Sequence, residues 1–168
     1  MELWDSYDRN GRLMDTTLVR DRAIPDGLYH IVCEVLVRHA DGNYLLMKRD
    51  EHKPIHPGEW EATAGGSAMQ GENPMACIRR ELLEETGLCA DAFTEIALEI
   101  NDRGHCRFHS FICTVNCDKA GVKLQEGETV AFKWISEEEF IRFVRSGQMI
   151  SGQYRRMQQW LKKKRYLL

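Results

Sequence analysis

The chain carries an acidic run in which three glutamates have helical spacing, Arg80-Glu81-Leu82-Leu83-Glu84-Glu85. On a helix of 3.6 residues per turn, Glu81, Glu84 and Glu85 fall within an arc of roughly 100°. Like charges at this spacing repel one another by about a few tenths of a kcal/mol per pair. A hard divalent cation would relieve the repulsion, because Mg²⁺ prefers carboxylate oxygen and keeps waters available for substrate phosphates. The run therefore predicts a Mg²⁺ site that acts on phosphates.

The alternative is an ordinary exposed helix, on which Arg79 and Arg80 neutralise the glutamates and the charges are simply solvated. The surrounding residues favour the functional site. From Gly66 through Glu72 to Leu88 they match G-x5-E-x7-R-E-U-x-E-E-x-G-U, with U aliphatic, at every specified position. Since each residue type has an average usage of about 6%, a chance match is rarer than roughly one in a million. The segment resembles the signature of the Nudix family.

The Nudix resemblance extends over Tyr29–Phe140 and implies an α/β fold, the Nudix α/β/α sandwich with a mixed β-sheet. It also implies bound Mg²⁺, with Mn²⁺ as the alternative ion. The implied metal ligands are Glu81, Glu84, Glu85, the backbone carbonyl of Gly65 and Glu72, which either ligates a further ion or supports the helix. Arg80 resembles the arginine that orients the metal-binding glutamates.

The chemistry that the resemblance implies is attack of a water on phosphorus, with cations polarising the phosphates and lowering the pKa of the water. The general base of such enzymes is either a glutamate of the helix, such as Glu84, or a glutamate on a later loop. Glu128 is the late-loop candidate, because its position before Trp134 resembles the family pattern. Glu126 is an alternative on the same loop, and a solvated acidic turn would give neither residue a role.

The implied reaction is Mg²⁺-dependent hydrolysis of a diphosphate linkage in a nucleoside diphosphate derivative or a similar small pyrophosphate. Lys48, Arg49 and Lys53 are the candidate contacts for phosphate oxygens, although such residues are more often solvated surface charges. Hydrolases of ADP-ribose in the family often carry a proline after the signature. No proline follows Pro74 in this chain, so ADP-ribose is less favoured.

Two other functions compete with hydrolysis. The segments Tyr29-His30 and Gly58-Glu59-Trp60 resemble the Nudix branch that includes isopentenyl-diphosphate isomerase. That enzyme needs a protonating cysteine and a metal-binding histidine, where this chain has Gly65 and Ser67. The second alternative is a non-catalytic, nucleotide-binding Nudix module. Such modules usually have a damaged glutamate helix, and this one is intact.

The elements that must position these residues alternate between short strands and helices. One expected hairpin joins Leu3–Tyr7 to Arg12–Val19 through Asn10-Gly11, a signal for a type I′ turn. A second joins Tyr29–Arg38 to Tyr44–Arg49, and a loop covers Asp50–Gly58. The central helix should begin with Asn73 as N-cap and Pro74 at its first position, and end at Gly87. Strands over Phe93–Ile100, Phe108–Asn116 and Thr129–Ile135, a helix from Ser136 and a helix over Gln153–Lys164 complete the expected mixed sheet.

Length and composition indicate one domain over residues 1–168, with an N-terminal hairpin extension over 1–28 and a C-terminal helix over 151–168. The net charge of −3 gives no support for nucleic-acid binding. With no apolar run long enough for a bilayer and no signal peptide, we expect a cytoplasmic protein that binds no membrane. The six cysteines form no disulfide framework and are expected to be small buried residues. The oligomeric state stays open, a homodimer included.

Overall fold

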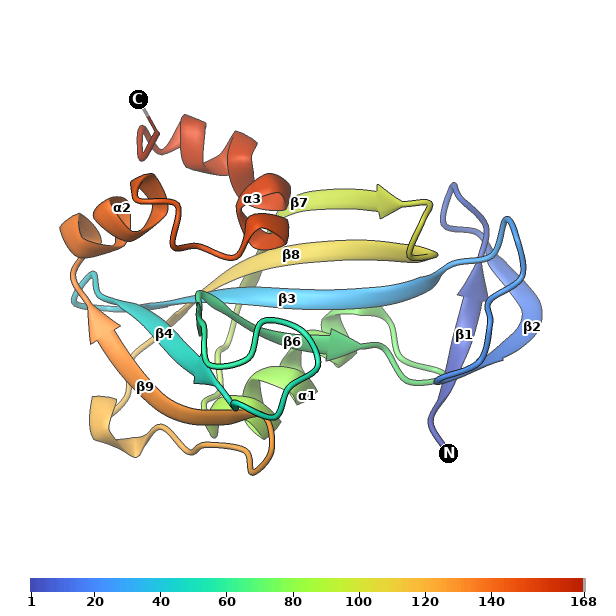
Figure 1. Ribbon diagram of the computed structural model, residues 1–168, viewed down its shortest axis with the longest axis horizontal. Coiled ribbons are helices and arrows are strands. Elements are labelled where there is room, and N and C mark those ends of the chain that lie inside the picture. The colour runs from blue at the N-terminus through green and yellow to red at the C-terminus, as the bar shows by residue number, and fades with distance from the viewer. Residues whose placement is uncertain (168) are drawn as a thin grey trace.

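The computed structural model describes residues 1–167, so that only Leu168, the end of the expected 151–168 extension, lies outside the described part. A mixed sheet forms the middle layer (Figure 1). Helix α1 (Pro74–Thr86) covers one face, and helices α2 (Glu137–Arg145) and α3 (Ser151–Lys163) cover the other. The expected α/β/α sandwich is confirmed.

The sheet has the strand order β5-β4-β3-β8-β7, with β6 paired to β3 and β9 paired to β4. Strands β3 and β8 run parallel, and the other pairs of this sheet are antiparallel. Strand bounds are β1 Leu3–Tyr7, β2 Leu13–Val19, β3 His30–His39, β4 Tyr44–Arg49, β5 Trp60–Glu61, β6 Thr63–Ser67, β7 Phe93–Asn101, β8 Cys106–Val115 and β9 Thr129–Ile135. A short 3-10 helix spans Lys119–Gly121.

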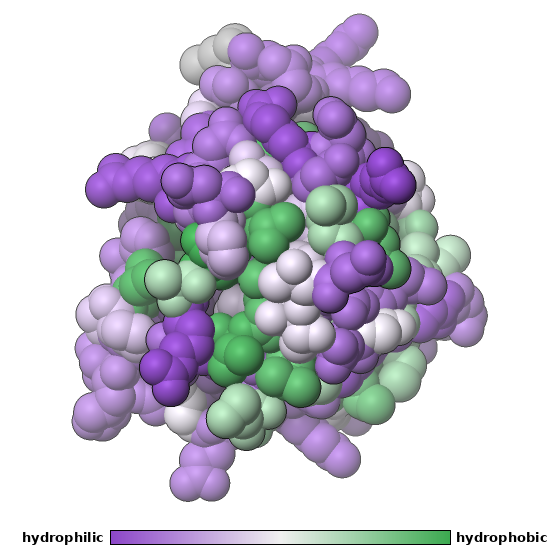
Figure 2. All heavy atoms as spheres, turned by 90° about the vertical axis from the view of Figure 1, so that its right-hand side faces the viewer, coloured by the Kyte–Doolittle hydropathy of each residue, from purple (hydrophilic) through white to green (hydrophobic). Residues whose placement is uncertain are grey.

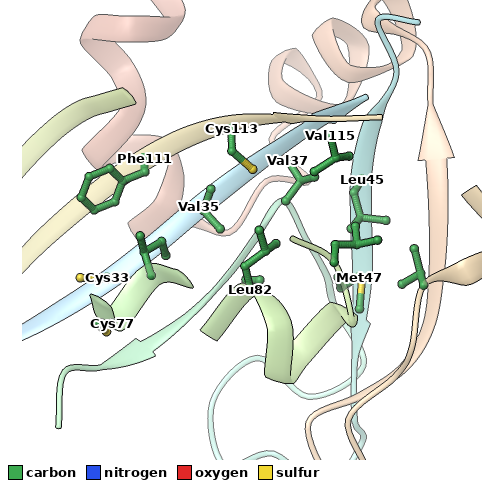
Figure 3. Close-up of a cluster of buried hydrophobic side chains, with 14 of the residues drawn as sticks. Cys33, Val35, Val37, Leu45, Met47, Cys77, Leu82, Phe111, Cys113 and Val115 are labelled. Atoms are coloured by element: carbon green, nitrogen blue, oxygen red, sulfur yellow. The ribbon is translucent and has the colours of Figure 1, made fainter. Parts of the chain in front are cut away.

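Strand β3 is buried on both faces and separates two cores. Val35 and Val37 point towards α1, where they join Leu82 and the other side chains drawn in Figure 3. Leu36 points to the opposite face and joins the cluster under α2 and α3. Because successive side chains of a strand alternate between faces, a continuous apolar run fills both layers at once.

Helix α1 has the predicted ends. The Asn73 side chain accepts a hydrogen bond from the Ala76 amide at 2.8 Å, and Pro74 occupies the first turn. Gly87 ends the helix with a φ of 70°, and its amide donates to the Leu83 carbonyl. These caps fix which residues are helical and therefore which faces the glutamates occupy.

The N-terminal hairpin is confirmed, and its turn type is corrected. Strands β1 and β2 pair only as far as Tyr7 and Leu13, so the connection is longer than two residues. A type I′ turn needs positive φ at both central residues. Gly11 has a φ of 89°, but Asn10 is not in that region, because the Asp8 carboxylate accepts the Asn10 amide and organises the loop instead.

Other differences from the expected elements are small. Strands β5 and β6 were not expected, since Gly65-Gly66 disfavours a strand in isolation and the pairing of β6 with β3 supplies the stabilisation. Helix α3 begins two residues before the expected Gln153. Cys33, Cys77 and Cys113 are buried free thiols as expected, whereas Cys89 is exposed. Among residues 1–167, no helix has both the length and the apolar character needed to cross a membrane.

Candidate metal and hydrolysis site

The three signature glutamates line one cavity of about 400 Å³. Helix α1 and the end of strand β6 both contribute residues to its lining. The cavity is lined by Glu2, Trp4, Arg20, Asp21, Lys53, Gly65, Gly66, Ser67, Met69, Arg80, Glu81, Glu84, Glu85, Gln125 and Glu128. A larger cavity of about 960 Å³ lies between α3 and strands β7 and β8, and it contains none of these residues. The carboxylates therefore identify the smaller cavity as the candidate site.

The two signature glycines let the β6 backbone approach the helix. The Gly65 amide donates to Glu85 Oε2 at 2.9 Å. A Cβ atom on Gly66 would lie 2.5 Å from Glu81 Oε1, and one on Gly65 would lie 2.1 Å from the Cys33 carbonyl oxygen. At Gly65 a larger residue would collide with backbone, so glycine is required there, whereas at Gly66 it would displace the Glu81 carboxylate.

Arg80 holds the acidic residues of the helix and its loop together. Its guanidinium donates to Glu72 at 2.7 and 2.8 Å, to Glu81 at 2.7 Å and to Glu84 at 3.0 Å. The hydrogen bonds that Arg80 donates, to Glu72 first and then to Glu81 and Glu84, raise its pKa. Glu72 is engaged by Arg80 and does not line the cavity. The geometry is that of an arginine that orients the glutamates, supported from behind by Glu72.

Glu85 lies in a desolvated and strongly acidic environment. Burial raises its pKa well above the usual value, and the nearby carboxylates of Glu61, Glu81 and Glu128 add to the effect. Burial also raises the pKa of Glu81, although Arg80 opposes it. Negative charge at this end of the cavity is therefore poorly compensated by the protein's own side chains.

Two loops, 50–58 and the one before β9, also contribute residues to the cavity lining. Lys53, from the 50–58 loop, makes an ion pair with Glu128, and the Asp50 amide donates to the Glu128 carbonyl at 2.9 Å. Glu128 lines the same cavity as the signature glutamates. Glu126 is exposed and lies outside the cavity lining.

Of the three basic residues expected to contact phosphate, the fold brings only Lys53 to the cavity. Arg49 donates to Glu61 at 3.0 Å and to the Ile55 carbonyl at 3.0 Å, so its guanidinium ties the 50–58 loop to β5. Lys48 lies 3.7 Å from Glu51. The sequence analysis missed Glu61, a buried acid whose charge helps to raise the pKa of Glu85. Its only signal was a charged residue four positions before Gly65.

The donor set suits a hard divalent cation. In the described part of the chain, no group of three or more His, Cys, Asp or Glu side chains is already arranged as a metal cluster. The reason is visible in the contacts, since Arg80 and the Gly65 amide occupy carboxylate oxygens of the signature. Carboxylate and backbone carbonyl oxygens are nevertheless the ligands that Mg²⁺ and Mn²⁺ favour. A cation bound to them would offset the uncompensated negative charge around Glu85.

The α/β/α fold places the signature glutamates in one acidic cavity. Residues 28–159 match the NUDIX domain family, and the chain belongs to it. The protein is a Nudix pyrophosphohydrolase, a class that generally uses divalent metal ions and acts on small molecules.

A curated relative supports the family assignment, and solved structures share the fold. The chain is 28% identical over 151 residues to the uncharacterised Nudix hydrolase lmo0368 of Listeria monocytogenes, with 89% of each chain covered. The crystal structure of DR0079 from Deinococcus radiodurans has a TM-score of 0.67 at 15% identity, covering 87% of this chain and 90% of that one. The NUDIX domain of Shewanella oneidensis NrtR, solved with ADP-ribose, has a TM-score of 0.53 at 14% identity, covering 68% and 77%.

Proposed function

We propose that the protein is a Mg²⁺-dependent hydrolase that cleaves the diphosphate linkage of a nucleoside diphosphate derivative or a similar small pyrophosphate. The observation that carries the proposal is the meeting of Glu81, Glu84 and Glu85 with the Gly65 backbone in one cavity. The ADP-ribose bound by the NrtR domain supports a nucleoside diphosphate derivative as the substrate class.

The residues that would hold the metal are Glu81, Glu84, Glu85 and the Gly65 carbonyl. In an extended strand the amide and carbonyl of one residue point to the same side. Because the Gly65 amide reaches Glu85, its carbonyl faces the same end of the cavity. Bound Mg²⁺ would supply Lewis acidity and lower the pKa of a water. Arg80 is the positioning residue, since it fixes Glu81 and Glu84 relative to Glu72.

Glu128 is the proposed general base. Its carboxylate lines the same cavity as the signature glutamates and makes an ion pair with Lys53. A carboxylate in that place can accept the proton of a water that attacks phosphorus. Glu84 is the alternative base, and it is the more exposed of the signature glutamates. Lys53 is the proposed phosphate contact in this cavity.

The isomerase alternative is disfavoured by packing as well as by residue type. A cysteine at position 65 would have its Cβ 2.1 Å from the Cys33 carbonyl oxygen, so the backbone here has no room for the acid that an isomerase requires. We expect no conversion of isopentenyl diphosphate to its dimethylallyl isomer. Detection of that isomer above a no-enzyme control, by mass-resolved chromatography, would contradict the proposal. Loss of all turnover in every assay would favour the non-catalytic module instead.

The test is a screen of purified protein with Mg²⁺ against nucleoside di- and triphosphates, dinucleoside polyphosphates, nucleotide sugars and prenyl diphosphates. Phosphate release is read with and without added pyrophosphatase. On the best substrate, Glu85→Gln should lower kcat by about 100-fold or more, comparable to the loss of one preorganised electrostatic group. Glu138→Gln, on the exposed surface of α2, is the matched control and should keep wild-type activity. Full activity of the Glu85 variant in Mg²⁺ would show that the active site lies elsewhere.

A further inference from the structure

The N-terminal hairpin forms a wall of the hydrolytic cavity. Glu2 and Trp4 from the β1 end, and Arg20 and Asp21 just after β2, line the cavity that holds the signature glutamates. The match to the family begins only at residue 28. This wall therefore lies outside the segment that the family model matches. Asp21 has a φ of 64°, a left-handed conformation that is uncommon outside glycine and is often found at functional sites.

The hairpin does not merely lie against the domain, because a chain of contacts fixes it. The Trp4 ring stacks on the His30 ring of β3, with centroids 4.1 Å apart and an interplanar angle of 8°. Trp4 Nε1 donates to one oxygen of Glu2 at 2.7 Å. The other Glu2 oxygen accepts from Arg20 Nη1 at 2.8 Å. Separately, the backbone N–H of Gln70 donates to the Leu3 carbonyl at 2.8 Å. Arg20 is thus oriented from the core through Trp4 and Glu2.

The apolar surface of the hairpin lies elsewhere on the same end of the molecule. Figure 2 shows apolar side chains among charged ones on the face at the hairpin end. The exposed apolar side chains of the hairpin are Leu3, Leu13 and Met14. They do not line the cavity, whose hairpin wall is polar apart from Trp4. The cavity wall is therefore suited to a charged ligand.

Arg20 is the most exposed of the basic side chains that line this cavity. The cavity is lined by three basic residues, Arg20, Lys53 and Arg80. Arg80 is saturated by three glutamates and the Ser67 carbonyl, and Lys53 is paired with Glu128. The Arg20 side chain is 59% exposed and makes one side-chain ion pair. A guanidinium has five N–H groups in a fork that matches phosphate oxygens, so most of its donors remain available.

A diphosphate needs positive charge on both sides. Divalent cations on the glutamates would face it from α1, but the rest of the lining also carries acids, namely Glu2, Asp21 and Glu128. Arg20 can offset that charge on the hairpin side. We infer that Arg20 binds a phosphate oxygen of the substrate on the hairpin side of the cavity, and that Trp4 and Glu2 are its positioning residues. The inference rests on the proposed function and names a specificity-determining residue for that reaction.

The kinetic test uses the best substrate of the screen. Arg20→Ala should raise KM by roughly 10- to 100-fold, as expected for loss of a hydrogen bond to a charged group. kcat should stay within about threefold, because the contact is made in both the ground state and the transition state. Arg20→Lys should recover part of the loss, since it keeps the charge but not the fork. Arg22→Ala, an exposed arginine outside the cavity, is the control. A KM for Arg20→Ala equal to that of the control would overturn the inference.

A binding measurement separates this inference from the proposed function. Imidodiphosphate, a non-hydrolysable diphosphate, is titrated calorimetrically into wild type, Arg20→Ala and Arg22→Ala with Mg²⁺ present. Arg20→Ala should bind about 10-fold or more weakly than the other two. If wild type hydrolyses no diphosphate but this difference appears, the proposed function fails and the inference stands. If wild type is active but the three proteins bind equally, the inference fails and the proposed function stands. Circular dichroism checks that each variant is folded.

Discussion

At the scale of single residues, Glu128 and Glu126 provide a matched comparison. Both are on the loop before β9, but only Glu128 lines the cavity. If Glu128 accepts the proton of the attacking water, Glu128→Gln should lower kcat by about 10²- to 10⁴-fold with Mg²⁺ affinity nearly unchanged. Raising the pH should partly rescue the variant, as hydroxide replaces the base. Glu126→Gln should behave as wild type.

The outcome for KM decides between roles. A Glu128→Gln variant with normal kcat and raised KM would show that this side chain only contacts the substrate. The base would then be sought first at Glu84, whose exposed carboxylate also lines the cavity.

His30 gives a second prediction at this scale, on stability rather than activity. Its side chain is buried under Trp4, and within residues 1–167 its Nδ1 has no hydrogen-bond partner. Burial lowers its pKa from 6.5 to about 4. A histidine with a lowered pKa takes up its proton more readily in the unfolded state, so it contributes no penalty above about pH 6.5 and destabilises the fold progressively from there down to about pH 4.

The expected size of this effect is about 2 to 3 kcal/mol of lost unfolding free energy between pH 7 and pH 4.5. His30→Phe keeps an aromatic ring for Trp4 but cannot be protonated. Urea unfolding of both proteins at the two pH values measures the difference. Equal pH dependence in wild type and His30→Phe would show that His30 does not titrate in this range.

At the scale of elements, the site depends on how closely strand β6 approaches α1. A methyl group on Gly66 would lie 2.5 Å from Glu81 Oε1, so Gly66→Ala should displace that carboxylate. We expect a loss of activity of about 10-fold or more, because a displacement of about 1 Å from productive geometry can cost 10²-fold. Gly121→Ala is the matched control, since it has open space and no positive φ.

Two further measurements distinguish a displaced Glu81 carboxylate in Gly66→Ala from misfolding. Gly66→Ala should keep its far-ultraviolet circular dichroism and a cooperative unfolding transition, because the contact is with a carboxylate at the edge of the core. Raised Mg²⁺ concentration should recover part of its activity if Glu81 has become a poorer ligand. Wild-type activity of Gly66→Ala at ordinary Mg²⁺ concentration would show that α1 and Glu81 can shift without loss of activity.

At the scale of the whole molecule, metal binding and stability should be linked. Burial and the neighbouring acids, Glu61 first among them, raise the pKa of Glu85, so its ionised form opposes folding at neutral pH. The destabilisation by a carboxyl group with a raised pKa is fully present above that pKa and decreases as pH falls below it. In a chelator at pH 7 to 8, Glu85→Gln should therefore melt at a higher temperature than wild type.

Saturating Mg²⁺ should reverse the order of the two proteins. A ligand that binds only the folded state stabilises it by about 2.7 kcal/mol at 100 times its Kd. Wild type should gain more than Glu85→Gln, which lacks one ligand. Thermal melts with chelator and with Mg²⁺ measure both effects, and Glu138→Gln should follow wild type in each. An equal Mg²⁺ shift in all three proteins would exclude Glu85 from the metal site.

The sequence by itself determined the local features of the site. Asn73 and Gly87 set the ends of α1, and the helical period then placed Glu81, Glu84 and Glu85 on one side. Both hairpins followed from turn residues and alternating strands. These features depend on neighbours within a few positions, where backbone geometry and capping dominate. The division into one domain with two terminal extensions stays a prediction.

Tertiary structure decided which distant residues meet the helix. Lys53 reaches the cavity whereas Lys48 and Arg49 do not, because the 50–58 loop turns back and Arg49 is taken by Glu61. The hairpin residue Arg20 arrives across 60 positions of sequence from Arg80, through a tryptophan stack that no local pattern encodes. Such contacts depend on how loops and layers pack and on which charged side chains form ion pairs with one another. Periodicity and turn residues carry information only about near neighbours in the sequence, so they predict the glutamate helix. The packing of loops and layers determines which other residues line the cavity.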